Sequence, residues 1–406
     1  MTTKTGWIGG KLPLTSTPLW RGLVESWVRD CRSGQITVRL PDGGTLVQSG
    51  REPGPTATIE LDSFRAVTQL LSKGELGFAE GYLNGYWSTP DLTALIEFAI
   101  RNKPDLNRTL RGSWLAQLMS KLRFRLQANS VAGAKRNIAY HYDLGNDFYK
   151  QWLDETMTYS SAIFAEPGQQ LADAQREKYR RVIEALDVRQ GDRILEIGCG
   201  WGGFAEIAAG EAGAKLTCLT ISQEQAAFAR ARIADAGLAD RVEIRLEDYR
   251  HAEGRYDKIV SIEMFEAVGE ENWPVFFEML ANRLVPNGRA LLQIITVPDD
   301  RFAAYRRTVD YIQRYIFPGG MLPSPGAVSE NADKAGLELR NVEFFGQDYA
   351  ETLRRWNARF QECWDDIARL DFDERFRRIW TYYLQSCEAS FRTGATDVGQ
   401  FLLAKS

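Results

Sequence analysis

A glycine-rich loop gives this sequence its first chemical signal. The letters Glu-Ile-Gly-Cys-Gly-Trp-Gly-Gly at 196–203 overlap the end of an apolar run, Arg193–Ile197, and lead into a helix-like segment. Glycine allows a ligand to approach the backbone closely, and α/β proteins bind nucleotides at the carboxyl ends of parallel strands. An acidic residue before Gly-x-Gly-x-Gly favours S-adenosylmethionine over a dinucleotide, while a purely structural turn is the alternative. The candidate cofactor-binding residues of the loop are Glu196, Gly198, Gly200 and Gly202.

A second polar cluster follows the third of the expected strands. Asp248 and Tyr249 come directly after the run Val242–Leu246. At this edge of a parallel sheet the Asp248 carboxylate can accept a hydrogen bond from an adenine, and a neighbouring side chain can stack on the ring. We therefore expect both residues to contact the cofactor.

The elements that must position these residues alternate between strand and helix after residue 185. Strand-like runs are separated by helical patterns such as Gln223–Ala236 and Trp273–Leu284, which is typical of an α/β domain with a largely parallel sheet. The expected strands are Arg193–Ile197, Leu216–Ile221, Val242–Leu246, Lys258–Ile262 and Ala290–Thr296. Residues Gln347–Thr393 are helical and rich in aromatics, and a strand-like segment follows them.

The first 100 residues predict a small α+β domain. Ile36–Leu40 and Thr56–Leu61 are strand-like, and Ser63–Ser72 and Leu92–Ile100 have helical patterns. A turn at 41–44 lies between two apolar runs and suits a hairpin. With a boundary in the basic stretch that follows, we expect an accessory, lipid-docking domain at 1–125 and a catalytic domain at 126–406.

Composition excludes several classes of protein. The 406 residues include only His141 and His251, and the five cysteines form no CxxC pair, so a multi-histidine metal site, a zinc site and a disulfide framework are not expected. The net charge of −4 argues against a nucleic-acid binder. No apolar run approaches the ~18 residues that a membrane-spanning helix needs, and the first residues lack the apolar region of a secretory signal.

Residues 101–136 carry nine basic side chains and one acid, a net charge of +8 that leaves −12 for the rest of the chain. Within this stretch, Trp114–Gln127 mixes apolar and basic residues at roughly helical spacing. One interpretation is a patch that meets an anionic membrane surface, where each Lys or Arg contributes ~1 kcal/mol. The other is a solvated linker helix that packs its apolar stripe on a neighbour.

Seven motifs, in this order, resemble those of the cyclopropane-fatty-acyl-phospholipid synthases. The resemblance is strong over residues 135–406 and loose before them. The motifs are HYDLGNDFY (141–149), MTYSSAIF (157–164), LEIGCGWGGFA (195–205), LTISQEQ (219–225), SIEMFEAVG (261–269), YIFPGGMLPS (315–324) and TYYLQSCEASF (381–391).

The resemblance implies a Rossmann-like class I methyltransferase domain with a helical acyl-binding insertion or lid. It also implies an enzyme that transfers the methyl group of S-adenosylmethionine to the cis double bond of an unsaturated phospholipid acyl chain, works at the inner face of the membrane and forms a homodimer. Aromatic side chains of the C-terminal third then suit an acyl tunnel and a carbocation, although core packing explains any single one. They are Phe317, Tyr349, Trp356, Phe360, Trp364, Trp380 and Tyr382. The further cofactor residues that it implies are Thr158, Tyr159, Ser160, Thr220, Ile221 and Gln225.

The resemblance further implies a bicarbonate ion as the base, but the residues at its site depart from the family pattern. The positions that match the family's ligands are Ser161, Glu266, Gln293, Ile295 and Tyr349. The usual cysteine is serine and the usual histidine is glutamine, which can donate hydrogen bonds but cannot supply a positive charge. Methyl transfer should survive these changes, whereas the removal of the proton is affected.

Glu263 adds an acidic side chain three residues before Glu266. If both carboxylates faced one pocket on a helical turn, their repulsion would raise one pKa and provide a protein-borne base. Alternatively, Glu263 ends a strand and only orients the cofactor.

We expect cyclopropane formation as the first outcome. The same methyl transfer without ring closure, giving a methyl-branched or methylene chain, is the alternative. A small-molecule N-methyltransferase and a non-catalytic lipid-binding homologue are further alternatives.

The basic stretch yields a direct prediction. Changing Lys121, Arg123 and Arg125 to Glu should weaken binding to anionic vesicles, because like charges then face the lipid headgroups. A vesicle-binding assay measures this, and unchanged binding of the triple variant would rule out the membrane-docking interpretation.

Overall fold

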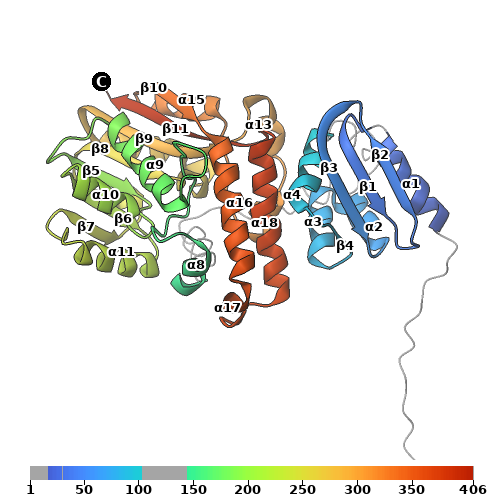
Figure 1. Ribbon diagram of the computed structural model, residues 1–406. Coiled ribbons are helices and arrows are strands. Elements are labelled where there is room, and N and C mark those ends of the chain that lie inside the picture. Colours follow the sequence, from blue (N-terminus) through green and yellow to red (C-terminus); the bar gives the residue numbers. More distant parts are fainter. Residues whose placement is uncertain (1–16, 30, 103–143, 406) are drawn as a thin grey trace, which may run out of the picture. The chain divides into compact units, whose positions relative to one another are not determined.

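The computed structural model describes residues 17–29, 31–102 and 144–405, which form two compact units (Figure 1). The predicted membrane-docking stretch 101–136 and the predicted domain boundary at 125/126 lie almost entirely outside these residues. Among the described helices, none is long and apolar enough to cross a bilayer.

The N-terminal unit is a four-stranded sheet in the order β2-β1-β3-β4 with helices α1 to α4. β1 and β2 pair antiparallel around the tight turn at 41–44, so the predicted hairpin is confirmed. β1 also pairs with β3, in parallel. The unit's elements are α1 (Thr17–Arg29), β1 (Ser33–Arg39), β2 (Thr45–Ser49), β3 (Glu52–Leu61), α2 (Arg65–Lys73), α3 (Glu75–Leu83), β4 (Trp87–Ser88) and α4 (Leu92–Arg101).

The second unit is built on a seven-stranded sheet in the order β10-β11-β9-β8-β5-β6-β7. The five strands from β5 to β9 run parallel, and β11 lies antiparallel between β9 and β10. All five predicted strands are confirmed, with shifts of one or two residues in β6 and β8, while β9 begins at Leu284, six residues before its predicted start. The strands are β5 (Arg193–Ile197), β6 (Lys215–Thr220), β7 (Val242–Leu246), β8 (Tyr256–Ile262), β9 (Leu284–Thr296), β10 (Leu337–Phe344) and β11 (Asp397–Lys405).

Helices cover this sheet, and a separate helical layer with α16 and α18 lies beyond the ends of its strands (Figure 1). One apolar core joins β5 and β6 to helices α9, α10 and α11, and a second joins β8 and β9 to α12 and α15. The helices are α8 (Asn146–Trp152), α9 (Leu171–Ala185), α10 (Gly203–Glu211), α11 (Gln223–Asp235), α12 (Trp273–Arg283), α13 (Asp299–Tyr305), α14 (Tyr311–Tyr315), α15 (Pro325–Lys334), α16 (Gly346–Glu362), α17 (Trp364–Ala368) and α18 (Glu374–Arg392), with short 3-10 turns η2 (Tyr249–His251), η3 (Phe265–Ala267) and η4 (Glu270–Asn272).

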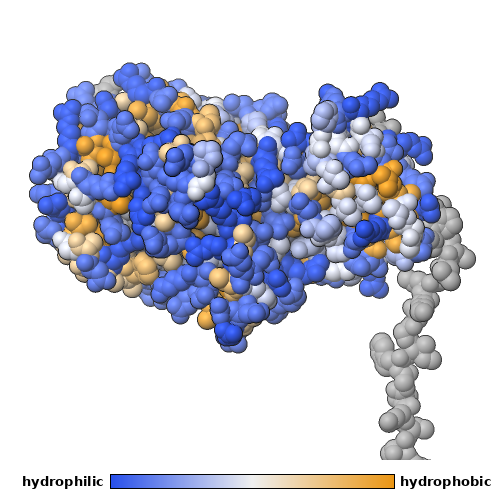
Figure 2. Space-filling model, in the orientation of Figure 1, coloured by the Kyte–Doolittle hydropathy of each residue, from blue (hydrophilic) through white to orange (hydrophobic). Residues whose placement is uncertain are grey.

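The long helices α16 and α18 lie side by side and carry most of the aromatic residues predicted for the C-terminal third (Figure 1). Hydrophilic residues predominate on the face of the second unit seen in Figure 2, with small apolar patches between them. The large apolar side chains that are exposed in the described residues are scattered: Val47, Leu246, Val275, Phe344 and Leu370.

Candidate active site

The glycine loop lies between β5 and α10, as the sequence predicts. Gly198, Gly200 and Gly202 have φ angles of +80°, +51° and +81°, a conformation that favours glycine. The N–H of Gly198 donates to the carbonyl of Leu219, which holds the loop against β6. A Cβ at Gly200 would meet nothing within 4 Å, while one at Gly198 would lie 2.7 Å from the side chain of Met264. The loop thus leaves open space beside its backbone, which fits a closely bound cofactor.

Other predicted cofactor residues gather at the same edge of the sheet. At the end of β6, the Thr220 hydroxyl donates to Gln225 Oε1 at 2.8 Å, and Ile221 follows in the chain. Beyond β7, the Asp248 carboxylate accepts bonds from the Arg250 guanidinium at 2.7 and 2.9 Å. Burial alone would raise the pKa of Asp248, but its bonds to Arg250 bring it below the usual value.

Two further predicted residues differ in burial, because Glu196 is buried and Tyr249 is partly exposed. Glu196 is buried in β5 opposite Cys218 of β6, and burial raises its pKa to about 8. The ring of Tyr249 packs against Phe276 with centroids 5.3 Å apart. Their contact with a cofactor stays a prediction.

A chain of hydroxyl groups fixes the loop that carries Thr158, Tyr159 and Ser160. Thr158 Oγ1 lies 2.8 Å from Thr156 Oγ1 and 2.9 Å from the Tyr179 hydroxyl. The Tyr159 hydroxyl lies 2.8 Å from that of Tyr383 on α18. The loop is therefore attached both to α9 and to the helical layer.

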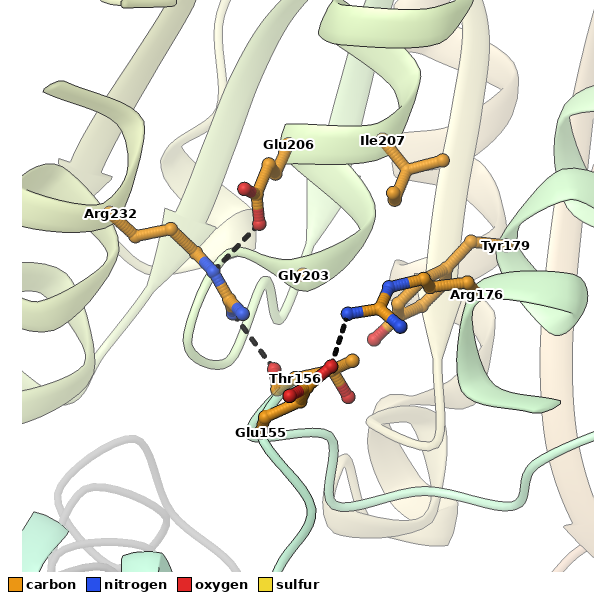
Figure 3. A pocket seen from close by; sticks show the side chains of 8 residues that line it. All are labelled: Glu155, Thr156, Arg176, Tyr179, Gly203, Glu206, Ile207 and Arg232. Carbon is orange, nitrogen blue, oxygen red and sulfur yellow. Dashed lines mark hydrogen bonds and ion pairs between the residues drawn. The ribbon is translucent and has the colours of Figure 1, made fainter. Parts of the chain in front are cut away.

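Behind this loop, charged side chains line a pocket of about 310 Å³ (Figure 3). Arg232 pairs with Glu206 at 2.8 Å and donates to the carbonyl of Thr156 at 2.8 Å, while Arg176 pairs with Glu155 at 2.6 Å. These ion pairs hold the start of the loop. None of the predicted catalytic residues lines the pocket.

The Glu263 carboxylate is the centre of the predicted catalytic cluster. Its Oε1 accepts hydrogen bonds from the Ser161 N–H and from Gln293 Nε2, both at 2.8 Å. Its Oε2 accepts one from the Tyr349 hydroxyl at 2.7 Å. The donors come from the loop after α8, from β9 and from α16. Glu263 itself follows β8 with φ +49°, a left-handed conformation that turns the chain away from the strand.

Glu266 lies in the next turn, η3, and completes the cluster. Its Oε1 accepts a bond from the Ile295 N–H at 2.6 Å, and its Oε2 is shielded from solvent and has no hydrogen-bond partner among the residues that the structure describes. Burial raises the pKa of Glu266 to about 8, and the charge of Glu263 adds to the rise. The two carboxylates are electrostatic neighbours, but a left-handed residue and a 3-10 turn join them instead of the helical turn considered from the sequence.

The structure thus brings Ser161, Glu263, Glu266, Gln293, Ile295 and Tyr349 to one place, and their catalytic role stays a prediction. The same geometry tests the bicarbonate site that the resemblance implies. The Ser161 N–H, the Gln293 amide and the Tyr349 hydroxyl already bind Glu263, the Ile295 N–H binds Glu266, and the Ser161 hydroxyl donates to the carbonyl of Ala162. Because the protein's own groups already occupy these donors, the site does not fit a bicarbonate ion in addition to Glu263.

Sequence reasoning missed Lys178, which is fully buried in α9. Its Nζ donates to Ser160 Oγ at 2.6 Å and to Gln175 Oε1 at 2.8 Å. Burial lowers the pKa of Lys178 to about 7, against the attraction of Glu263 and Asp154. The available signal was the position of two polar residues, Gln175 and Lys178, on the otherwise apolar stripe of this helix.

Gln400 on β11 is a second residue that the sequence did not reveal. Its Nε2 donates to Gln293 Oε1 at 3.1 Å. This bond orients the Gln293 amide so that its nitrogen points to Glu263.

Of the predicted acyl-binding aromatics, Tyr349, Trp356 and Trp380 belong to a packed cluster between α8, α16 and α18, while Tyr382 packs on Tyr311 and Phe360 on Trp364. Trp356 lies 5.7 Å from Trp152 and 5.4 Å from Tyr159 between ring centroids, so the cluster reaches the cofactor loop. Tyr349, Trp356, Phe360, Trp380 and Tyr382 are buried, whereas Phe317 and Trp364 are partly exposed.

The sheet order and the glycine loop define an S-adenosylmethionine-dependent methyltransferase fold. The family model described as mycolic acid cyclopropane synthetase matches residues 130–401, and the chain belongs to this family. It is a fatty acyl methyltransferase that uses S-adenosylmethionine.

Two relatives and one solved structure illustrate the relationship. The tuberculostearic acid methyltransferase of Mycobacterium tuberculosis is 43% identical over 82% of this chain and 79% of its own length. The cyclopropane-fatty-acyl-phospholipid synthase of Escherichia coli is 33% identical over 94% of each chain. The crystal structure of a mycolic acid cyclopropane synthase with S-adenosylhomocysteine matches with a TM-score of 0.63 and 32% identity, over 67% of this chain and 98% of its own.

The raised pKa of Glu266 predicts how stability depends on pH. Between about pH 4.5 and 8 the folded state keeps a proton that the unfolded state has released, so stability falls as pH rises across this window. Glu266→Gln removes that contribution. The Tm of the variant minus the Tm of wild type should therefore increase from pH 5 to pH 8, by roughly 2–4 °C for each kcal/mol of stability that wild type loses over this range.

Thermal unfolding in matched buffers measures this difference. Glu271→Gln, at an exposed position nearby, is the control. Parallel Tm curves for wild type and Glu266→Gln would contradict the assignment.

Proposed function

We propose that this enzyme methylates the double bond of unsaturated phospholipid acyl chains without closing a ring, so that the product is a methyl-branched or methylene chain. The observation that carries the proposal is the altered base site. Gln293 and Ser161 stand where the family usually has a histidine and a cysteine. The Gln293 amide and the Ser161 N–H both donate to the carboxylate of Glu263.

The comparisons support the same product. The relative at 43% identity is named for tuberculostearic acid, a methyl-branched fatty acid, whereas the relative named for cyclopropane formation is 33% identical. Ring closure, which we expected first from the sequence, is therefore the less supported outcome. The N-methyltransferase alternative has only a fold-level likeness, to a coclaurine N-methyltransferase structure at 19% identity.

The residues of the site suit this chemistry. S-adenosylmethionine supplies an electrophilic methyl group. Because an alkene is a weak nucleophile, the loop from Thr158 to Ser160 and the glycine loop must hold the reactants in line, which lowers the barrier through positioning. The buried aromatic cluster around Trp356 excludes water, which would otherwise capture a carbocation, and its ring faces can stabilise positive charge.

The position of the proton acceptor selects the product. Loss of a proton from the added methyl group, while the cation lies on the next acyl carbon, closes the ring. Loss of a proton from a neighbouring acyl carbon leaves a methyl-branched alkene. A methylene chain forms when a hydride first shifts from the methyl-bearing carbon, so that the methyl proton is lost beside the cation. Glu263 is attached to the end of β8 and fixed by three hydrogen bonds. A carboxylate held in this way has less freedom to follow the methyl carbon than a small bound ion has.

The proposal includes the location, the membrane contact and the oligomeric state that we expect from the sequence. The enzyme works at the cytoplasmic face of the membrane, docks through the basic residues 101–136 and forms a homodimer. The family relationship to a phospholipid-modifying synthase supports a phospholipid substrate.

Expression in a host that lacks its own cyclopropane synthase tests the product. We expect phospholipid acyl chains that gain one CH2 and still react with ozone, because they keep a carbon–carbon double bond. Mass spectrometry with double-bond localisation measures both properties. A chain of the same mass that resists ozone would show ring closure, and no added carbon would favour the N-methyltransferase or the non-catalytic alternative.

A further inference from the structure

The donors around Glu263 form an anion-binding site that is occupied by a carboxylate of the protein itself. Three hydrogen bonds reach the two oxygens at 2.7 to 2.8 Å, from a backbone N–H, an amide and a phenol. Distances of this length are typical of charge-assisted bonds to a carboxylate. Burial keeps the pKa of Tyr349 well above its usual value, so that its hydroxyl stays a donor.

The site still leaves one place for a proton. A carboxylate offers roughly four lone-pair positions, and the three bonds above occupy three of them, two on Oε1 and one on Oε2. The second position on Oε2 is the remaining acceptor. Burial raises the pKa of Glu263, which makes its carboxylate a stronger base than an exposed one.

Glu263 is also close to the expected cofactor. The next residue, Met264, packs on Gly198 of the glycine loop, and Ser161 follows the predicted cofactor residue Ser160. As a residue Glu263 is partly exposed, while its carboxylate is desolvated and surrounded by the three donors.

Lys178 supplies a positive charge inside the protein. Its ammonium binds Ser160, whose neighbour Ser161 binds Glu263, and it attracts the Glu263 charge directly. Burial disfavours the charged forms of both Lys178 and Glu263, while the attraction between their opposite charges favours those forms. The other titratable groups at Glu263 are Tyr349 on α16 and Glu266 on η3. Asp154 acts on Lys178, and Tyr159 and Cys387 act on Tyr349.

We propose that the Glu263 carboxylate is the base of this enzyme, that it takes the place of the family's bicarbonate ion, and that Lys178 is its positioning residue. The inference rests on the proposed function. After methyl transfer, Glu263 accepts a proton from a carbon next to the cationic carbon, and the electrons of that C–H bond form the new double bond. Glu263 becomes a neutral acid and releases its proton to water after turnover, and no oxidant or reductant is required.

Two substitutions at one position test the base. Glu263→Gln keeps the shape of the side chain but not its basicity, so product formation should fall by about 10²- to 10⁴-fold. Glu263→Gly removes the side chain at a left-handed residue that suits glycine, and frees the donors of Ser161, Gln293 and Tyr349. Adding bicarbonate should therefore restore activity to Glu263→Gly but not to Glu263→Gln.

These assays use purified enzyme in buffer freed of carbon dioxide, with and without added bicarbonate. Wild type should be equally active in both, and Glu271→Gln should behave like wild type. Wild-type activity that depends on bicarbonate, or an active Glu263→Gln, would overturn the proposal.

A binding measurement separates this inference from the proposed function. Titration of bicarbonate, followed by calorimetry on the purified proteins, should show binding to Glu263→Gly and none to wild type. Since no lipid is present, this result holds whichever product the enzyme forms. Binding to wild type would overturn the inference and leave the proposed product untouched.

The role of Lys178 is tested separately, through the pH dependence of kcat. Glu263 must be ionised to act, so the rate falls as pH falls through its pKa, and loss of the nearby ammonium raises that pKa. Lys178→Met should therefore move the acid limb of the kcat profile to higher pH, while Lys178→Arg should restore it. Lys334→Met, at an exposed helix position, is the control. A change confined to the KM for S-adenosylmethionine, with an unmoved acid limb, would assign Lys178 to the cofactor loop alone.

Discussion

The buried charge of Glu263 is the constraint around which the catalytic unit is arranged. A carboxylate removed from water is costly unless donors surround it, and here the donors come from elements that are far apart in the sequence. Ser161 belongs to the loop after α8, Gln293 to β9 and Tyr349 to α16. Satisfying one side chain therefore attaches the cofactor loop and the helical layer to the end of β8.

A second layer of polar residues makes this arrangement rigid. Gln400 fixes the orientation of the Gln293 amide, and Lys178 with Gln175 holds Ser160 from the side of α9. The Thr156, Thr158 and Tyr179 hydroxyls extend the network to the ion pairs of the polar pocket. Such networks are stabilising only when nearly every member is satisfied. Among the described residues, Oε2 of Glu266 and Oδ1 of Asp154 beside Thr156 are exceptions, and the raised pKa of Glu266 favours its neutral form.

The parallel strands could be predicted from the sequence because β-branched and other apolar residues run through them between clear turn signals. Strand β10 was not predicted, because its alternation of apolar and charged residues breaks at Arg340–Asn341, where its register with β11 shifts, and only Leu337 is buried in it. The six catalytic candidates could be named through the family resemblance, but not the way in which they meet. That depends on the left-handed backbone at Glu263, which the residue type does not favour, and on contacts between β9, α16 and β11. Lys178 was missed because a lysine in a helix usually faces solvent.

The position of β11 in the sheet has a consequence for biosynthesis. This strand lies between β9 and β10, although residues 397–405 are synthesised after all the other strands. Until it emerges from the ribosome, β9 has an open edge and Gln293 lacks the Gln400 contact. The catalytic unit can therefore complete its sheet only after translation has passed these residues. A nascent chain that stops short of them exposes an apolar strand edge, the kind of surface that chaperones bind and that promotes aggregation.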